Sequence, residues 1–210
     1  MESNTSSSSI SLVIQAGGKS SRMGENKMLM QFLGVPLIER VLERTKNIAQ
    51  EVIVVSNVPD ELAFLDAKIV RDSIGGLGAI GGLYTAMDKA SNELVAVVAG
   101  DLPFVSTAIL NEGVRLLEFT GGDVAIPKIG RKFFEPLHAV YRRDTCKNAI
   151  FQAIKEDKRR LVSWLPSVRV IEMDDELCRQ LDPDCLAFTN INSKEDFLQA
   201  EQIGLCYQTK

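Results

Sequence analysis

The chain has 210 residues, 45% of them hydrophobic and 25% charged, and its formal net charge is −4. This composition is typical of a globular protein, and the length suits one ordinary domain that is large enough for a sizeable core. The negative balance predicts no general attraction to nucleic acid or to anionic membranes, so a polyphosphate site would have to be locally basic. No apolar run approaches the ~20 residues that cross a bilayer.

The cysteines and the single histidine predict neither a zinc site nor a disulfide framework. No C-x-x-C pair occurs, and His138, which falls in a predicted strand, is expected to be structural. Reduced thiols and a cytoplasmic location are therefore expected for the four cysteines, Cys146, Cys178, Cys185 and Cys206.

Residues 1–9 are polar and serine-rich, with neither a basic start nor an apolar segment. Such a segment is not a secretory signal, and we expect it to be a disordered tail. The remainder, residues 10–205, shows no internal repeat and no interdomain linker, which predicts a single domain.

A buried strand runs from Ile10 to Ile14 and leads directly into a glycine-rich loop. Glycines allow backbone N–H groups to turn toward an anion without a Cβ in the way, and nearby cations add charge. We therefore predict that the loop binds phosphates, although it matches neither the P-loop nor the dinucleotide-binding spacing. The residues concerned are Gln15, Ala16, Gly17, Gly18, Lys19, Arg22 and Lys27. Because Lys27 follows a polar loop, we expect its side chain to be only slightly buried.

Strands and helices alternate from residue 10 to about residue 126, which predicts a largely parallel sheet covered by helices. Residues 28–33 are expected to be extended. Helices are expected over 37–48, up to about 90, and from a cap at Ser106 to 117, where apolar residues recur at helical spacing. Strands are expected at 52–55, 68–71 and 94–99.

The second half of the chain is less regular. Strands are predicted at 123–127 and 136–141 around a possible hairpin, with one strand reversed, and another strand is predicted at 168–173. Helices are predicted at 144–154 and around Leu161, Trp164 and Leu165. A polar linker then leads to a last helix, which Ser193 and Asp196 begin in the manner of a capping box.

Several polar residues follow the predicted strands, at the edge where ligands of such sheets gather. Asp101 ends the most hydrophobic strand and is expected either to hold Mg²⁺ or to cap the next turn. Asp72, which opens a glycine stretch containing Gly78, is expected either to accept hydrogen bonds from a nucleoside or to serve as a turn residue. Asn57 is expected to cap a turn or to touch a base.

The loop resembles the signature A-G-G-x-S-x-R-M-G-x-x-K of nucleotidyltransferases that join an NTP to a phosphate and release pyrophosphate. The adjacent glycines Gly17 and Gly18 are more similar to those of the molybdenum cofactor guanylyltransferases than to the Ala-Ala-Gly of cytidylyltransferase relatives. Two positions depart from the family pattern: Gln15 replaces the usual Leu, and Asn26 replaces the usual Asp.

The resemblance implies a three-layer, Rossmann-like α/β domain of the nucleotide-diphospho-sugar transferase fold with a mostly parallel, mixed sheet. It implies the transfer of GMP from GTP to molybdopterin, or to molybdenum-molybdopterin, with Mg²⁺ as cofactor. Molybdenum-insertion and molybdoenzyme-maturation proteins are further expected partners. Alternatives are a cytidylyltransferase, an enzyme with another phosphorylated acceptor, and a non-catalytic nucleotide-binding chaperone of molybdoenzymes.

The resemblance also assigns roles to individual residues. Gly100-Asp101-Leu102-Pro103-Phe104 fits the family's magnesium motif, and Asp72 matches the aspartate that contacts the guanine nucleotide. Asn190 and Asn192 belong to a C-terminal signature associated with the acceptor, and a cap of the last helix is the alternative role for Asn192. The basic cluster that contains Arg159 is expected to be either a solvated face or a contact for the pterin phosphate. The expected catalytic residues are Arg22, Lys27 and Asp101, and the expected nucleotide-binding residues are Gln15, Ala16, Gly17, Gly18, Lys27, Asn57, Asp72, Gly78 and Asp101.

Overall fold

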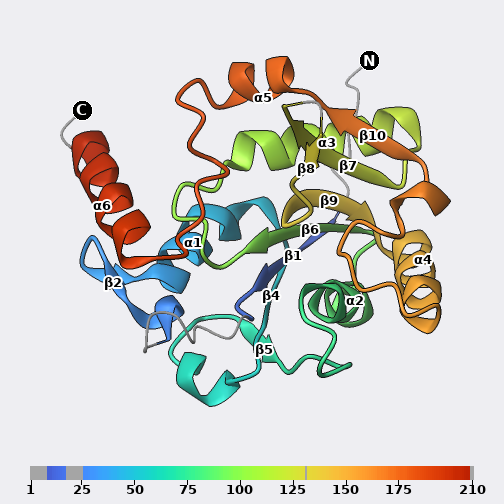
Figure 1. The fold of residues 1–210 in the computed structure, drawn as a ribbon, viewed down its shortest axis with the longest axis horizontal. Helices are drawn as coiled ribbons and strands as arrows, with labels where there is room; N and C mark the ends of the chain where they lie inside the picture. The colour runs from blue at the N-terminus through green and yellow to red at the C-terminus, as the bar shows by residue number, and fades with distance from the viewer. Residues whose placement is uncertain (1–8, 18–25, 131, 209–210) are drawn as a thin grey trace, which may run out of the picture.

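A central sheet runs through the computed structural model, which describes residues 9–17, 26–130 and 132–208 (Figure 1). Its strands are Ile10–Gln15 (β1), Glu51–Val55 (β4), Lys68–Val70 (β5), Leu94–Ala99 (β6), Val124–Ile129 (β7), Phe133–Phe134 (β8), His138–Arg142 (β9) and Val170–Met173 (β10). Their order is β10-β7-β9-β6-β1-β4-β5, and β8 pairs with β7. Gln31–Phe32 (β2) and Val35–Pro36 (β3) form a separate two-stranded hairpin.

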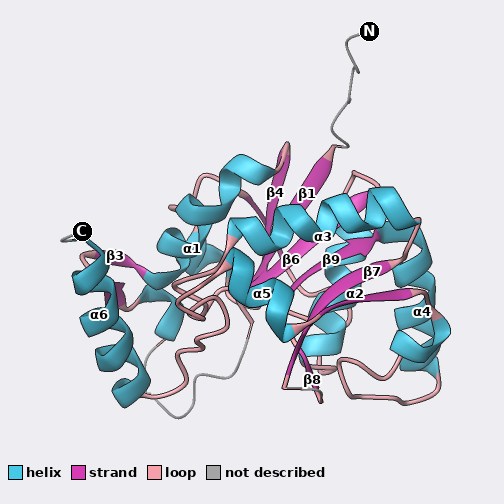
Figure 2. Ribbon diagram, turned by 90° about the horizontal axis from the view of Figure 1, so that it is seen from above, coloured by secondary structure: helices cyan, strands magenta, loops and turns pink. Residues whose placement is uncertain are grey.

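Helices cover both faces of the sheet, as Figure 2 shows from above. They are Leu37–Thr45 (α1), Ala79–Lys89 (α2), Thr107–Thr120 (α3), Arg143–Lys155 (α4), Asp175–Leu181 (α5) and Lys194–Gln208 (α6). Helices α1 and α3 pack on one face, and α2 and α4 pack side by side on the other. The predicted three-layer α/β arrangement is therefore confirmed.

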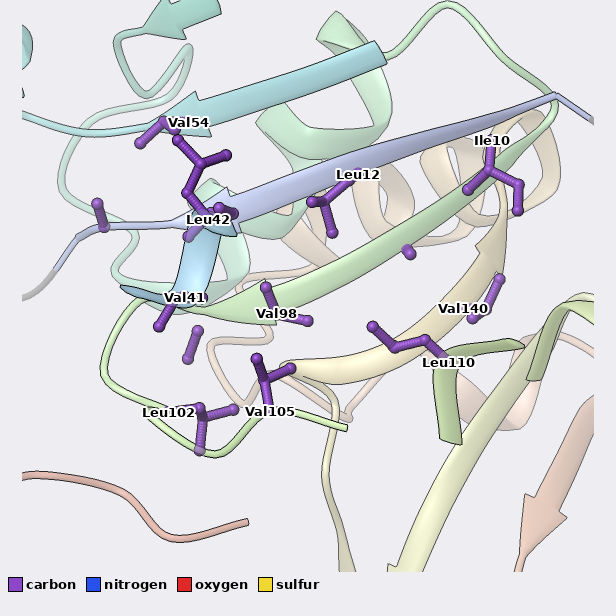
Figure 3. Close-up of a cluster of buried hydrophobic side chains, with 14 of the residues drawn as sticks. Ile10, Leu12, Val41, Leu42, Val54, Val98, Leu102, Val105, Leu110 and Val140 are labelled. Atoms are coloured by element: carbon purple, nitrogen blue, oxygen red, sulfur yellow. The ribbon is translucent and has the colours of Figure 1, made fainter. Parts of the chain in front are cut away.

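The core is divided by the sheet because successive side chains of a strand point to opposite faces. Leu12 of β1 belongs to the cluster under α1 and α3, together with Val41 and Leu110 (Figure 3). Val13 belongs instead to the cluster under α2 and α4, where it joins Ile80. Residues an even number of positions from Val13 in β1 therefore face α2.

The reversed strand predicted in the second half is β9. It is antiparallel to both of its neighbours, β6 and β7, whereas β10 is parallel to β7, and β1 is parallel to both β4 and β6. The predicted hairpin is also present, because Lys128 and Ile129 of β7 pair with Phe134 and Phe133 of β8. The sheet is therefore mostly parallel, as expected.

Two predicted helix starts are confirmed by their hydrogen bonds. The Ser106 hydroxyl accepts from the backbone N–H of Ile109 at 3.4 Å at the start of α3. At α6, Asp196 N donates to Ser193 Oγ at 3.1 Å and Ser193 N donates to Asp196 Oδ2 at 2.8 Å. This reciprocal pair is a capping box with Asp in place of Glu.

Three local predictions were wrong. The helix expected around Leu161 and Trp164 is a series of turns followed by a 3₁₀ helix at Leu165–Ser167, because Pro166 lacks an N–H donor and cannot continue an α-helix. The polar linker contains α5, which Asp174 caps by accepting from Leu177 N at 2.9 Å. The extended piece expected at 28–33 begins instead as a 3₁₀ helix, Lys27–Leu29.

No helix in the described part of the chain is both long and apolar enough to cross a lipid bilayer. Most of the predicted N-terminal tail, residues 1–8, lies outside the described residues.

Candidate active site

Two cavities lie at the edge of the sheet where β1, β4, β5 and β6 end, as expected for a largely parallel sheet. The first has a volume of about 510 Å³ and the second about 290 Å³. Gln15 and Gly17, at the end of β1, line both of them. The first is also lined by Val55, Ser56, Asn57, Asp72, Gly76, Gly78, Ala79 and Gly82. The second is also lined by Met28, Ala99, Asp101, Leu102, Glu135, Pro136, Leu137, Leu161, Asn190 and Asn192.

The first cavity brings together three residues predicted for nucleotide binding: Asn57, Asp72 and Gly78. One carboxylate oxygen of Asp72, Oδ1, accepts from Ile74 N at 3.0 Å and from Thr85 Oγ1 at 2.8 Å. Asp72 therefore orders the following turn, as one of its two expected roles requires, and its place in the cavity wall leaves the contact with a nucleoside as a prediction. Gly78 has φ of +63°, a backbone conformation that side-chain-bearing residues rarely adopt.

The start of α2 approaches the floor of this cavity closely. A Cβ on Gly81 would lie 3.0 Å from Asp72 Oδ2, and a Cβ on Gly82 would lie 2.7 Å from Gln15 Oε1. Contacts this short have no room for a methyl group, so two adjacent glycines allow the Asp72 and Gln15 side chains to reach the helix. The glycine stretch therefore shapes the floor of the cavity.

The second cavity has an ion pair in its wall. Lys27 Nζ donates to Asp101 Oδ2 at 2.6 Å and to the backbone carbonyl of Ile191 at 3.0 Å. The backbone N–H of Ile191 donates in turn to Asp101 O at 3.1 Å. These bonds tie the end of the glycine loop, the turn after β6 and the C-terminal segment to one another.

The Lys27 side chain is only 16% exposed, so the expectation of slight burial was wrong. Its ammonium group turns inward because Asp101 and the Ile191 carbonyl supply acceptors there. Asn26, one of the departures from the family pattern, caps the 3₁₀ turn that carries Lys27: its side chain accepts from Met28 N at 3.2 Å and donates to Glu61 Oε2 at 2.7 Å.

The predicted acceptor residues Asn190 and Asn192 line the second cavity together with Asp101. Glu135, on the turn between β8 and β9, also lines it, and its partial burial raises the pKa of its carboxyl. The turn is fixed by its backbone, since Glu135 N donates to Pro127 O at 3.0 Å and Glu135 O accepts from His138 N at 3.1 Å. This cavity therefore offers carboxyl and amide groups to a polar ligand.

The remaining predicted residues either do not line a cavity or lie outside the described residues. Arg159 follows α4, bonds Asp157 Oδ1 through its Nε at 2.7 Å, and does not line either cavity. Ala16 is buried, and its N–H donates to Val55 O at 2.9 Å. Gly18, Lys19 and Arg22 lie outside the described residues.

The donors at the second cavity fit a hard divalent cation held largely by its substrate. Asp101 contributes a carboxylate, and the side chains of Asn190 and Asn192 contribute amide oxygens nearby. Over the ranges 9–17, 26–130 and 132–208, no three His, Cys, Asp or Glu residues cluster as a metal site. Mg²⁺ suits such a place, because it binds through one or two carboxylates together with substrate phosphates and water.

Sequence reasoning did not find every residue that supports the site. Thr85 of α2 donates to Asp72 and accepts from Ser73 N at 2.9 Å, which holds the turn that carries the Asp72 carboxylate. No spacing in the sequence indicates this partnership, because the two residues belong to different elements. Leu161, which was expected in a helix, lies in a turn and lines the second cavity.

Comparisons with known proteins agree with this geometry. The sequence model of one family, described as "MobA-like NTP transferase domain", matches residues 12–170. A protein of Natranaerobius thermophilus named "Probable molybdenum cofactor guanylyltransferase" is 34% identical over 92% of this chain and 95% of its own length. The "Molybdenum cofactor guanylyltransferase" of Desulfosudis oleivorans is 29% identical over 90% of this chain and 93% of its own length.

A solved structure, that of molybdopterin-guanine dinucleotide biosynthesis protein A from Archaeoglobus fulgidus, superposes with a TM-score of 0.81 at 27% identity. The superposition covers 94% of this chain and 99% of that one, which confirms the predicted fold. The family match includes the ends of β1, β4, β5 and β6 and every residue named above for the first cavity, and it ends before Asn190 and Asn192 of the second cavity. The chain belongs to the family of MobA-like NTP transferase domains.

Proposed function

We propose that this chain transfers GMP from GTP to the terminal phosphate of molybdopterin, forming the guanine dinucleotide of the cofactor and pyrophosphate. The observation that carries the proposal is the pair of adjoining cavities that share Gln15 and Gly17. A transferase that joins two large substrates needs two adjacent sites, and the named relatives are guanylyltransferases of this cofactor.

The proposed reaction is a displacement at phosphorus. An oxygen of the acceptor phosphate forms a bond to the α-phosphorus of GTP, the bond from that phosphorus to its bridging oxygen breaks, and pyrophosphate leaves. The protein has little covalent chemistry to perform in such a step, so positioning and neutralisation of charge dominate.

We assign the nucleoside to the first cavity, next to Asn57, Asp72 and Gly78, and the acceptor to the second, next to Asn190 and Asn192. The triphosphate would then pass the shared residues Gln15 and Gly17, where the glycine loop begins. Lys27 supplies positive charge at the second cavity. The roles of Gly18 and Arg22 in the same loop, and of Arg159 toward the acceptor, stay predictions.

Enzymes of this kind generally use a divalent cation, and we propose Mg²⁺, held by Asp101. When bound, Mg²⁺ offsets negative charge on phosphate oxygens. The predicted partnership with molybdenum-insertion and molybdoenzyme-maturation proteins, the cytoplasmic location and the extent of a single domain over 10–205 stay predictions.

The proposal is tested by following pyrophosphate release with GTP, ATP and CTP in separate reactions, each with molybdopterin and with Mg²⁺. Release with GTP alone, dependent on the acceptor, is the expected result. Equal release with CTP would assign the chain to the cytidylyl branch. GTP binding without release of pyrophosphate would support the chaperone alternative instead.

A further inference from the structure

Gln15 occupies the boundary of the two cavities with a side chain that is only 7% exposed. Its amide nitrogen, Nε2, is buried and has no hydrogen-bond partner among the residues that the structure describes. An unpaired polar group in such a place destabilises the free protein, because it has lost water without gaining a partner. A polar residue here is therefore costly unless a group other than the described residues pairs with it.

The direction of the side chain follows from its position in β1. Gln15 is two residues beyond Val13, which packs under α2, so both point to the same face of the sheet. The amide accordingly lies against Gly82 of α2, at the floor of the first cavity. Gly82 lines the first cavity and is not among the described residues that line the second, so we relate the Gln15 amide to the first cavity.

Asp72 reaches the same part of α2. A Cβ added to Gly81 would lie 3.0 Å from Asp72 Oδ2, and a Cβ added to Gly82 would lie 2.7 Å from Gln15 Oε1. The two side chains thus meet consecutive residues of one helical turn and line one cavity. They differ in chemistry, since a carboxylate only accepts hydrogen bonds whereas a primary amide also donates them.

We propose that Gln15 is a specificity-determining residue that donates a hydrogen bond from Nε2 to O6 of guanine, while Asp72 accepts from the neighbouring N–H groups. This inference rests on the proposed function. Guanine offers an acceptor, O6, beside its N1–H and N2–H₂ donors, which matches one amide donor beside one carboxylate. Adenine carries an amino group at the position of O6, so it cannot accept there.

Rotation about the last side-chain bond of Gln15 exchanges the places of Oε1 and Nε2. This torsion is soft, so the donor can turn from the wall to the bound base at little cost. A leucine at this position, the usual residue of the resembling enzymes, has no such donor. The chain therefore has one base contact that the usual family sequence does not provide.

The test measures binding of GTP and of ATP to the full chain by calorimetry, without acceptor, for the wild type and for Gln15→Leu. We expect Gln15→Leu to bind GTP about fivefold more weakly, the loss of one ordinary hydrogen bond, with ATP binding unchanged. The thermal stability of the free variant should rise, because the unpaired buried amide is gone. Gln15→Met, which is closer in length, is the second variant if the leucine packs poorly.

Ser163→Ala is the matched control. Its hydroxyl oxygen is also buried without a partner among the described residues, but Ser163 lines neither cavity. The control should gain stability in the free protein without any change in the ratio of GTP to ATP affinity.

An unchanged ratio of GTP to ATP affinity in both Gln15 variants overturns the inference while leaving the proposed function intact. An equal loss for both nucleotides also overturns it, because the contact would then be with sugar or phosphate. A wild type that does not prefer GTP contradicts the proposed function itself, and the inference fails with it.

Discussion

Lys27 and Asp101 form an ion pair at the second cavity. The side chains of Lys27 and Asp101 are each only 16% exposed, so both have lost much of their contact with water. Each charge of such a pair is stabilised by the other, so removing one member leaves an uncompensated charge. Lys27 joins the end of the glycine loop to the C-terminal segment, so we expect its removal to affect both binding and local order.

We expect Lys27→Ala to lower the rate of pyrophosphate release by about 10²-fold or more, because charge stabilisation in a transition state is worth about 2.7–4 kcal/mol. The variant should remain folded but melt at a lower temperature, since Asp101 loses its partner. The control is Lys46→Ala, whose ion pair with Glu43 is exposed and lies outside both cavities. Near-normal turnover by folded Lys27→Ala would remove Lys27 from the catalytic group.

Asp101→Asn separates a metal ligand from a structural carboxylate, since it removes a charge and barely changes shape. We expect turnover to fall by about 10²-fold, the order of a lost electrostatic contribution, and to recover only in part at high Mg²⁺. Binding of GTP, measured by calorimetry, should change little because the first cavity does not include Asp101. A normal rate with an unchanged Mg²⁺ dependence would contradict the metal role.

At the scale of single residues, the sequence predicted which side chains lie at the cavities better than it predicted their surroundings. The motif spacing identified Lys27, Asp72 and Asp101, and the structure brings each of them to a cavity wall or its ion pair. The inward turn of Lys27 depends on the Ile191 carbonyl, 164 residues away, and no local pattern records that distance.

Helix α3 lies so close to β9 that the packing favours glycine at position 113. A Cβ on Gly113 would lie 2.9 Å from Val140 Cγ2, in a part of the core where Val140 is fully buried. Helix propensity favours alanine over glycine, whereas packing at this contact opposes it.

We expect Gly113→Ala to destabilise the protein by about 1 kcal/mol, since overpacking costs about 1–3 kcal/mol and helix propensity returns up to about 1. Thermal unfolding measures the change. Val140→Ala removes the obstructing methyl, so adding Gly113→Ala to that variant should be neutral or stabilising. The same penalty in both backgrounds would show that Val140 is not the cause.

Elements were predictable where one periodic pattern ran without interruption. The strands β1 and β6 are of this kind. The starts of α3 and α6 were predictable from their capping residues instead. The helix expected near Trp164 failed because Pro166 outweighs a short apolar pattern, and α5 was missed because its seven residues are mostly polar.

The stability of the whole molecule should depend on pH through His138. Burial lowers the pKa of this imidazole to about 4, and its ring nitrogens lie 3.3 Å from Ala187 O and 3.1 Å from Ser106 O. The unfolded chain takes up a proton below about pH 6.5, whereas the folded protein does so only near the lowered pKa. The unfolded state therefore binds more protons between these values.

We expect the free energy of unfolding to fall as the pH falls from about 6.5 to about 4, with His138 contributing up to about 3 kcal/mol of the loss. Urea unfolding at several pH values measures the slope. His138→Asn does not titrate and should show a smaller slope over this interval. An equal slope in the two proteins would assign the acid sensitivity to other groups.

The whole fold was the most predictable level, because alternating strands and helices allow few arrangements and the reversed β9 followed from the hairpin before it. The division of the site into two cavities was not predictable in this way. It depends on how the turn after β8 and the segment around Ile191 fold back onto the end of β6.

The residues that line the first cavity all fall between positions 15 and 82, whereas those of the second extend from position 15 to position 192. Substitutions can therefore change the lining of one cavity without changing that of the other. For example, substitutions between Glu135 and Asn192 can reshape the second cavity while the residues that line the first cavity stay unchanged. Among the described residues, Gln15 and Gly17 are the two that line both cavities, so these two positions limit how independently the two specificities can evolve.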